Sequence, residues 1–232
     1  MALALCGCAG PPVESADTRA AASIAEVRTG LPPCEATGAA VHLGGGIFVT
    51  AAHVVDGTPA RLRGCAPARA RSVISFQGKA GLAQLIGAGT AEVAPVIGLR
   101  YLGGRDIGLL RLADSSGPAA HLCRFDPLAD ETVIVASPRR VFRTHVLGTM
   151  REDIGIYGGY AEIAVRMEPG ESGAGVFDAA RACLLGVVSH RDAPSPERTR
   201  IVLTSALRAF LAEEQARLPA AIAGVAVQPR RW

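Results

Sequence analysis

The feature that most constrains the fold is a series of short β-prone runs separated by turn residues. Glycines and prolines are spread along the chain without a period, which favours many short segments over a few long helices. Such runs at fairly regular intervals are typical of an all-β sandwich or barrel. The runs occupy residues 41–43, 47–50, 73–76, 94–99, 107–112, 132–136, 142–147, 160–165, 175–177, 184–189 and 200–203.

Two further patterns divide the chain. Residues 114–120 (DSSGPAA) combine turn formers with no apolar period, so we expect a link between two halves there. Beyond Leu203 the apolar residues follow a spacing near 3.6, at Leu207, Phe210, Leu211 and Leu218. A single C-terminal helix is therefore predicted after the last strand.

The composition is typical of a folded chain that buries a core. Hydrophobic residues make up 49% of the 232 residues and charged residues 19%, with a mean hydropathy of +0.28. No stretch reaches the roughly 18 consecutive apolar residues that a bilayer-spanning helix needs. The net charge is +3, but all the Lys and Arg residues except Lys79 are Arg, and the basic pairs Arg139–Arg140 and Arg230–Arg231 are not interleaved with several aromatic residues. We expect no nucleic-acid partner.

The N-terminus has the character of an export signal. Residues 5–8 (LCGC) resemble a bacterial lipoprotein lipobox with Cys8 as the acylated residue, and residues 11–18 form a polar, proline-containing tether. We interpret residues 1–29 as an export or lipoprotein-like segment, which places the protein in the periplasm or cell envelope, lipid-anchored, or secreted. The other interpretation is a disordered tail in which Cys6 and Cys8 are inert thiols.

Four cysteines lie in the remainder of the chain. An even number suits two disulfides in an oxidising compartment, and their order alone allows three connectivities. No pair has the C-x-x-C spacing of a zinc site, and no third ligand accompanies the histidines at a sensible spacing, so no metal is expected. The four are Cys34, Cys65, Cys123 and Cys183.

Three segments carry residue types suited to chemistry. His53 follows a β-prone run at a turn, and histidine can accept and return a proton near neutral pH. Asp106 precedes an apolar strand, where a carboxylate needs a hydrogen-bond donor. Ser172 lies between glycines, in a turn that can direct backbone N–H groups to one point. Each residue alone is more often structural, but the order His, Asp, Ser is that of a known catalytic triad.

These segments resemble the signature motifs of the trypsin/chymotrypsin-like serine peptidases, especially their compact bacterial branches. The matching residues are 50–53 (TAAH), 106–110 (DIGLL) and 170–173 (GESG), and the resemblance covers roughly residues 34–212. It implies an all-β fold of two packed antiparallel six-stranded β-barrels with a C-terminal α-helix. The first barrel would span residues 30–120, and the second barrel with the helix would span 121–232.

The resemblance assigns a role to each residue of the triad. His53 would be the general base, Asp106 would fix its tautomer, and Ser172 would be the nucleophile. The backbone N–H groups of Gly170 and Ser172 would form the oxyanion hole. No cofactor is expected, and the protein would act as a monomer on a protein or peptide substrate.

Other residues would line the substrate cleft or support the triad. Ser189 resembles a family serine that supports the catalytic aspartate, and His190 and Arg166 are candidates for the cleft. Arg166 or Arg191 at the base of the specificity pocket would favour an acidic residue before the scissile bond, whereas Met167 would favour an apolar one. The sequence leaves these alternatives open.

Glu171 departs from the trypsin pattern. The trypsin branch pairs the acidic residue before the nucleophile with a new N-terminus, but no Ile-Val-Gly-Gly-like activation sequence occurs upstream here. We expect a nearby arginine such as Arg166 to pair with Glu171 instead.

The resemblance also bears on the disulfides. Cys123 resembles a cysteine after the inter-barrel crossover that ties down the N-terminal segment, which implies a Cys34–Cys123 bond. The simpler alternative pairs Cys34 with Cys65 and Cys123 with Cys183, and the sequence does not decide between them.

The sequence thus predicts a serine endopeptidase that works through an acyl-enzyme. The alternative is a catalytically silent relative that acts as a binding or scaffolding module. An α/β-hydrolase is disfavoured, because residues 170–174 (GESGA) lack the last glycine of the nucleophile motif. Asp178 and His190 follow Ser172, but both are too close in sequence to belong to separate later strands of a doubly wound sheet.

Overall fold

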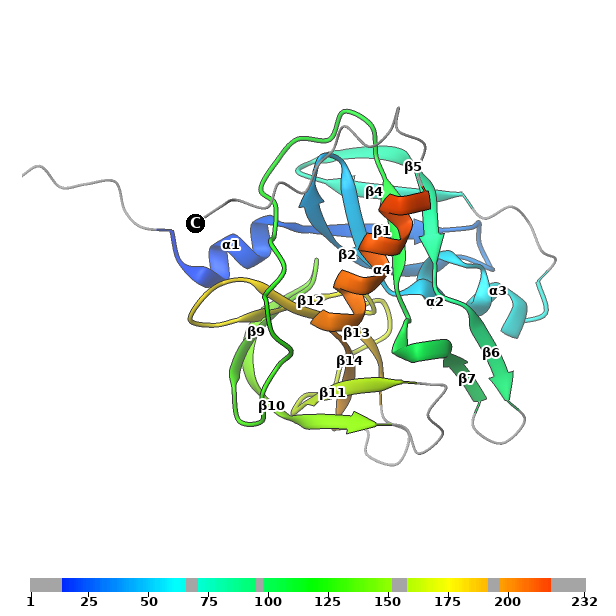
Figure 1. Cartoon of the computed structure of the whole chain (residues 1–232). Coiled ribbons are helices and arrows are strands. Elements are labelled where there is room, and N and C mark those ends of the chain that lie inside the picture. The colour runs from blue at the N-terminus through cyan, green and yellow to red at the C-terminus, as the bar shows by residue number, and fades with distance from the viewer. Residues whose placement is uncertain (1–13, 66–70, 95–97, 152–157, 192–196, 218–232) are drawn as a thin grey trace, which may run out of the picture.

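Two closed antiparallel β-barrels form the body of the protein (Figure 1). The computed structural model describes residues 14–65, 71–94, 98–151, 158–191 and 197–217. Each barrel has six strands, and a C-terminal helix follows the second, which confirms the predicted fold class.

The first barrel has the strand order β1-β2-β3-β8-β5-β4. A separate β6–β7 hairpin and three short helical segments extend from it. Its elements are β1 (Ile24–Thr29), β2 (Ala36–Gly44), β3 (Ile47–Thr50), α2 (Ala52–Val55), α3 (Thr58–Leu62), β4 (Ser72–Phe76), β5 (Lys79–Ala88), β6 (Ala91–Ala94), β7 (Gly98–Tyr101), η1 (Leu102–Gly104) and β8 (Gly108–Arg111).

The second barrel has the strand order β10-β11-β14-β13-β12-β9. The N-terminal helix α1 (Ala16–Ala22) packs against β9 and β10, and α4 (Thr204–Arg217) packs against β13 and β14. The strands are β9 (Thr132–Ala136), β10 (Val141–Arg151), β11 (Gly159–Ile163), β12 (Gly175–Asp178), β13 (Leu184–Arg191) and β14 (Thr199–Leu203).

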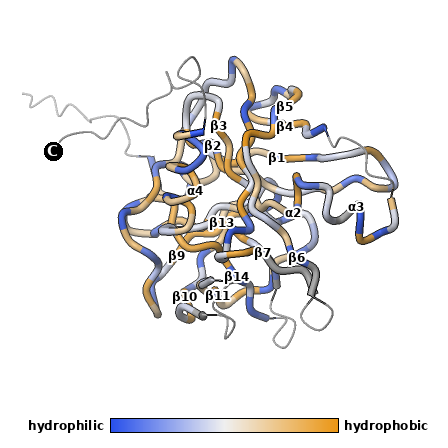
Figure 2. Tube along the Cα trace, turned by 45° about the vertical axis from the view of Figure 1, so that its right-hand side comes forward, coloured by the Kyte–Doolittle hydropathy of each residue, from blue (hydrophilic) through white to orange (hydrophobic). Residues whose placement is uncertain are grey.

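Alternation of buried and less buried side chains explains why these segments form strands. In β4, Ser72, Ile74 and Phe76 are buried, and the residues between them are only half-buried, which is the period-2 pattern of a strand with one face on the core. Apolar positions follow the strands of both barrels in Figure 2. One apolar cluster contains buried residues of both barrels, such as Val49 of the first and Phe177 of the second. The interface between the barrels is therefore part of the core.

The first barrel begins earlier in the chain than expected. β1 spans Ile24–Thr29, whereas the barrel was expected from residue 30 and residues 1–29 were interpreted as a tether. Its inward residues Ala25 and Val27 are small, and the charged Glu26 and Arg28 alternate with them, so the apolar signal is weak. Pairing with β2 and β4 on both sides holds this strand.

The link between the barrels is fixed by His42. The Nδ1 atom of this buried histidine lies 2.9 Å from the carbonyl oxygen of Pro118, and Ala120 N–H donates to the carbonyl of His42 at 2.8 Å. Residues 114–120 contain no strand and run between β8 and β9.

Each disulfide closes a loop within one barrel. The bonds join Cys34 to Cys65 and Cys123 to Cys183. The Cys34–Cys123 bond implied by the family resemblance is therefore wrong, and the simpler alternative is confirmed. The reason is local pairing at the start of the second barrel, where Cys123 N–H donates to the carbonyl of Leu184 and brings Cys123 beside Cys183.

The predicted export segment and lipid-attachment site stay predictions. Cys6 and Cys8 lie outside the described residues. Among the helices that are described, none is both long enough and apolar enough to cross a membrane.

Candidate active site

His53 lies in the short helix α2, directly after β3. The small residues Ala51 and Ala52 are fully buried and let this helix pack closely on the barrel. The backbone N–H of His53 donates to Asp106 Oδ1 at 3.0 Å, and its Nδ1 lies 2.8 Å from Asp106 Oδ2. Two contacts to one carboxylate fix both the backbone and the ring of His53.

Asp106 is placed by a glycine turn that precedes β8. Gly103 and Gly104 have φ angles of +65° and +68°, a conformation that side chains other than glycine rarely adopt. A Cβ on Gly104 would lie 2.6 Å from the carbonyl oxygen of Gly159, so only glycine fits. The carboxylate of Asp106 is 2% exposed and is held beneath His53.

The pKa values of the pair are shifted in opposite directions. Burial by itself lowers the pKa of His53, but the charge and hydrogen bond of Asp106, with a smaller contribution from Asp56, raise it above its usual 6.5. Burial by itself raises the pKa of Asp106, but His53 and the Ser189 hydroxyl lower it below its usual value. Asp106 is therefore a carboxylate, and His53 Nδ1 carries the proton of their hydrogen bond.

Ser189 in β13 forms a further contact to Asp106. Its hydroxyl donates to Asp106 Oδ2 at 2.5 Å, and the serine is 1% exposed. The structure thus places Ser189 against the aspartate, as the family resemblance implied. This bond links the second barrel to the carboxylate of the first.

Ser172 lies in a turn that both barrels hold in place. Its carbonyl oxygen accepts from Ala39 N–H of β2 at 2.7 Å, and Gly173 N–H donates to Val188 O of β13 at 2.8 Å. Gly173 has a φ of +84°, and a Cβ there would collide with the carbonyl of Ala39. Ser172 and His53 line the same cavity, which has a volume of about 210 Å³.

The N–H groups of Gly170 and Ser172 are free to receive an oxyanion. Neither donates a hydrogen bond to any group in the described part of the chain. Gly170 has a φ of +90°, and Glu171 N–H and Ala174 N–H close the turn around it by donating to the carbonyls of Glu168 and Glu171. Unpaired N–H groups in one tight turn are the donors that oxyanion stabilisation requires.

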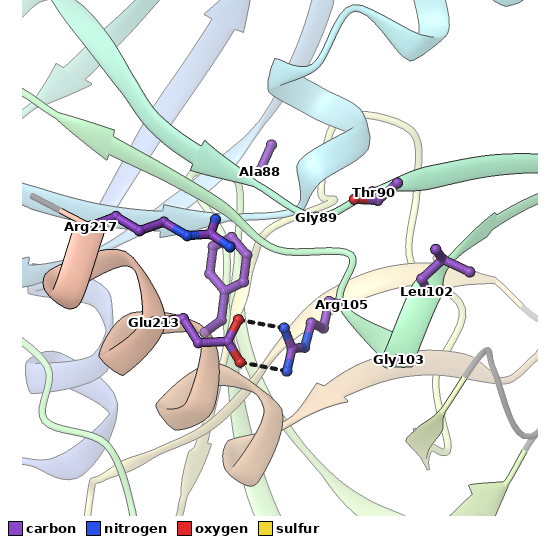
Figure 3. Close-up of a pocket in the computed structure, with 9 residues that line it drawn as sticks. Ala88, Gly89, Thr90, Leu102, Gly103, Arg105, Glu213 and Arg217 are labelled. Atoms are coloured by element: carbon purple, nitrogen blue, oxygen red, sulfur yellow. Dashed lines mark hydrogen bonds and ion pairs between the residues drawn. The ribbon is translucent and has the colours of Figure 1, made fainter.

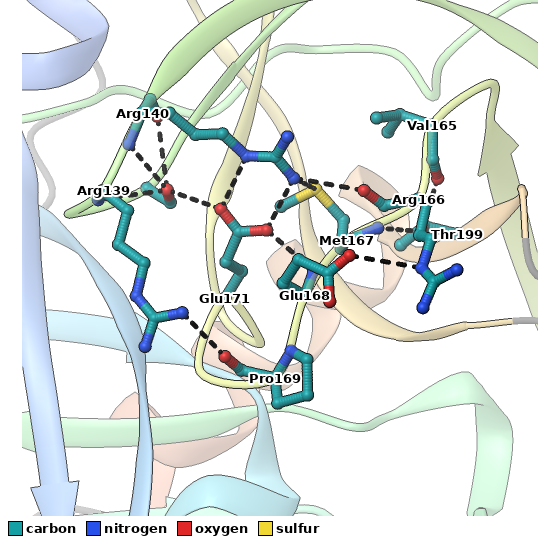
Figure 4. A network of polar contacts seen from close by, with 10 residues as sticks. Arg139, Arg140, Val165, Arg166, Met167, Glu168, Pro169, Glu171 and Thr199 are labelled. Carbon is teal, nitrogen blue, oxygen red and sulfur yellow. Dashed lines mark hydrogen bonds and ion pairs between the residues drawn. The ribbon is translucent and has the colours of Figure 1, made fainter.

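Glu171 is the centre of a polar network beside this turn (Figure 4). Its buried carboxylate accepts from Arg140 Nε at 2.9 Å and from Arg140 Nη2 at 2.7 Å. Ser137 Oγ and Glu168 N–H also donate to it. Burial by itself raises the pKa of Glu171, but Arg140 and these other donors lower it.

The prediction that Arg166 pairs with Glu171 is wrong. Arg166 Nε lies 3.2 Å from Glu168 Oε1 in an ion pair whose two side chains are each 50% exposed. Arg140 takes its place because the turn between β9 and β10 passes beside the nucleophile turn in the folded chain. The Arg139–Arg140 doublet was visible in the sequence, but nothing there indicated its partner.

The cavity beside Ser172 has an apolar lining with a polar rim. Met167, Val188 and Thr199 are buried in its wall. The Thr199 hydroxyl donates to the carbonyl of Val165 at 2.7 Å, and Met167 N–H approaches its oxygen at 3.3 Å. The complete lining is His53, Met167, Glu168, Pro169, Ser172, Val188, Ser189, His190 and Thr199.

The structure brings only part of the predicted cleft together. His190 lines the cavity, whereas Arg166 is absent from the described residues that form its wall. The side chain of Arg191 lies outside the described part of the chain. Of the three residues considered for the specificity pocket, Met167 therefore forms part of the buried wall of the cavity.

A second cavity of about 330 Å³ lies between α4 and the first barrel (Figure 3). Arg105 donates to both carboxylate oxygens of Glu213 there, at 2.6 and 2.8 Å. None of the triad candidates lines this cavity. The Arg105–Glu213 pair links helix α4 to the residue before Asp106. Within the described residues no cluster of side chains could hold a metal ion.

The fold and the site together define a two-barrel serine peptidase of the chymotrypsin type. The model of the family described as "Trypsin-like peptidase domain" matches residues 36–187, about two thirds of the chain. The chain belongs to this family of serine endopeptidases. No curated protein sequence matches it.

Solved structures share the fold at low sequence identity. The HtrA-type protease AlgW, solved with a tripeptide, is 21% identical with a TM-score of 0.67, covering 87% of this chain and 63% of AlgW. The active form of the protease Rv3671c from M. tuberculosis is 15% identical with a TM-score of 0.63, covering 95% and 98%. The serine endoprotease from Yersinia pestis is 14% identical with a TM-score of 0.61, covering 88% and 68%. This chain thus spans less than two thirds of AlgW.

Proposed function

We propose that the protein is an active serine endopeptidase that hydrolyses peptide bonds through an acyl-enzyme on Ser172. The observation that carries the proposal is the buried His53–Asp106 pair, which shares one cavity with Ser172. Membership of the trypsin-like peptidase family supports the same reaction.

The proposal assigns each step of the reaction to a residue of the site. Nε2 of His53 takes the proton of Ser172 Oγ, which attacks the carbonyl carbon of the scissile bond. The resulting oxyanion is bound by the N–H groups of Gly170 and Ser172, each worth about 2.7–4 kcal/mol in such sites. His53 then returns the proton to the leaving amine. A water molecule, deprotonated by the same nitrogen, releases the acid and regenerates Ser172.

We propose a protein or peptide substrate with an apolar side chain before the scissile bond. The buried walls formed by Met167 and Val188 support this preference, because a charged side chain would lose its hydration against them, and the carboxylate of Glu168 at the rim is already paired with Arg166. Arg166 is engaged with Glu168, and Arg140 with Glu171, so neither is directed to the cavity as a counter-ion. Structures of AlgW with a tripeptide and a decapeptide are consistent with peptide binding in this fold.

Export is part of the proposal. Two disulfides, one in each barrel, favour an oxidising compartment, such as the periplasm, the cell envelope or the exterior. Acylation at Cys8 would anchor the protein, which is proposed to act as a monomer. Incorporation of a labelled fatty acid into the full chain, compared with Cys8→Ser, tests the anchor, and equal incorporation in both would remove Cys8 from this role.

Labelling with a fluorophosphonate probe tests the catalytic assignment directly. The probe reacts only with an activated serine, so the unmutated protein should label, and Ser172→Ala and His53→Ala should not. Ser116→Ala is the matched control, because Ser116 lies exposed in the link between the barrels. Circular dichroism should show the same fold for all four proteins.

The same experiment separates the proposal from its alternative. No labelling of a well-folded unmutated protein would overturn the proposal and favour a binding or scaffolding module. Labelling that persists in Ser172→Ala would remove Ser172 from the mechanism.

A further inference from the structure

We propose that His190 is a positioning residue, which holds the Ser189 hydroxyl toward Asp106 and so orients the His53–Asp106 pair. The inference rests on the proposed peptidase function and adds a second histidine to its site. His190 is the residue after Ser189 at the end of β13, and it is half-buried beside the cavity.

Three polar groups are arranged in series behind the catalytic histidine. Ser189 Oγ lies 2.8 Å from His190 Nδ1 and 2.5 Å from Asp106 Oδ2. The same Oδ2 atom lies 2.8 Å from His53 Nδ1. Ser189 and Asp106 are 1% and 2% exposed, so water does not substitute for these contacts.

The number of protons decides the direction of each bond. A serine hydroxyl has one proton, and an ionised carboxylate only accepts. Asp106 accepts from the backbone N–H and the Nδ1–H of His53. Because this carboxylate has no proton to donate, the proton in its contact with Ser189 must come from the Ser189 hydroxyl. Ser189 Oγ can then only accept from His190, and Nδ1 of His190 must carry the proton. The order is His190 Nδ1–H to Ser189 Oγ–H to Asp106 Oδ2.

This donation has two effects on the carboxylate. A hydroxyl that accepts one hydrogen bond becomes a better donor, because bonds in a chain polarise one another. The donor also removes the freedom of the hydroxyl to rotate away from Asp106. A directed Ser189 proton holds Oδ2 at the position that His53 Nδ1–H requires.

The ring of His190 packs against an aromatic ring from another strand of the second barrel. Tyr160 in β11 lies edge-on to it, with ring centroids 5.4 Å apart and an interplanar angle of 81°. Tyr160 is 1% exposed, so the surrounding core holds its ring in place. The packing keeps Nδ1 directed to Ser189.

Substitutions that move the donor by one atom position test the proposal. In His190→Asn the side-chain amide nitrogen can occupy the place of Nδ1, whereas in His190→Gln it reaches the place of Nε2. We expect His190→Asn to keep kcat within about twofold and His190→Gln and His190→Leu to lower kcat about fivefold, as for one lost hydrogen bond. The KM for a short peptide substrate should change less than kcat.

A double-mutant cycle with Ser189→Ala shows whether His190 acts through Ser189. In the Ser189→Ala background, His190→Leu should have no further effect on kcat, and the pH profile should be that of Ser189→Ala alone. An equal loss in both backgrounds, or a change confined to KM, would overturn the proposal and make His190 a substrate contact. If His190→Leu does not fold, the Asn and Gln variants carry the same comparison.

Failure of the peptidase function gives a different result. In that case the unmutated protein does not label with the fluorophosphonate probe. Labelling of the unmutated protein together with additive effects at His190 and Ser189 would overturn only the role of His190.

Discussion

The guanidinium of Arg140 donates to both carboxylate oxygens of Glu171, the residue directly before Ser172. The carboxylate is buried, whereas Arg140 is 41% exposed. The pair therefore anchors the turn that carries Ser172, and both of its partners are internal residues of the chain. A released N-terminus is therefore not needed to hold Glu171.

Breaking this pair should impair acylation more than folding. Glu171→Gln removes the charge that Arg140 pairs with, so the N–H groups of Gly170 and Ser172 should lose their alignment and the labelling rate should fall about tenfold or more. Arg140→Ala should also lower the free energy of unfolding by about 1–2 kcal/mol, less than for a fully buried pair because Arg140 is partly solvated. Labelling kinetics and thermal unfolding measure the two effects.

Arg166→Ala is the matched control for this prediction. It breaks only the exposed pair with Glu168 and should change the free energy of unfolding by less than about 0.5 kcal/mol. Unchanged stability and labelling in Glu171→Gln would contradict the role of the Arg140–Glu171 pair.

Activity should rise with pH as His53 loses its proton. The raised pKa of His53 predicts a midpoint of kcat/KM above 6.5, the usual value for histidine. Peptide hydrolysis measured from pH 5 to 9 gives this midpoint. A flat profile, or a midpoint below 6.5, would rule out His53 as the base in this environment.

The same pair sets the sign of the pH dependence of stability. Because the folded state raises the pKa of His53, its contribution is complete below the unfolded pKa and fades as pH rises through the folded value. Because the folded state lowers the pKa of Asp106, its contribution is present above 3.8 and is lost as pH falls through the folded value. Denaturant unfolding of Asp106→Asn should therefore show a weaker acid-side dependence than that of the unmutated protein, and the remainder should come from Glu171 and Asp178, whose pKa values are also lowered. An unchanged acid-side dependence would contradict the contribution of Asp106.

Each disulfide should stabilise one barrel by closing a long loop. The bonds span sequence separations of 31 and 60 residues, for which loop-closure entropy gives about 4 kcal/mol each. The double variants Cys34→Ser/Cys65→Ser and Cys123→Ala/Cys183→Ala should lower the unfolding midpoint in urea. Mass spectrometry of digests should find the same two pairs, and a peptide that joins Cys34 to Cys123 would contradict them.

The cavity predicts which side chain precedes the scissile bond. Peptides with Leu, Met or Val at that position should be cleaved at least about tenfold faster than those with Lys, Arg, Asp or Glu, because a charged group would lose its hydration against Met167 and Val188 while Glu168 is already paired with Arg166. A peptide library measured by mass spectrometry gives the order. Met167→Ala should enlarge the cavity and move the preference toward larger apolar side chains. A preference of the unmutated protein for charged side chains would contradict the assignment.

Much of the fold, and the segments that carry the candidate triad residues, could be predicted from local sequence. The period-2 runs mark most strands, because a strand with one face on the core alternates its side chains. Glycines mark the turns at Gly104 and Gly173, where a side chain would collide with backbone. His53, Asp106 and Ser172 stand in segments whose local chemistry is distinctive.

Partners across the fold could not be predicted in this way. Arg140 reaches Glu171 from another turn, and Ser189 joins His190 to Asp106 from the other barrel. β1 was overlooked because its inward residues are small and its pairing with β2 and β4 supplies what its own pattern lacks.

The strands, the turns and the order of the candidate triad residues follow from the amino-acid sequence, because these depend on interactions within a few residues. The choice of the arginine that pairs with Glu171, the pairing of the four cysteines and the contact of His190 with Ser189 beside Asp106 follow from the folded barrels alone. Barrel closure sets these distances, since it brings together residues that are far apart in the chain and whose local patterns carry no trace of one another.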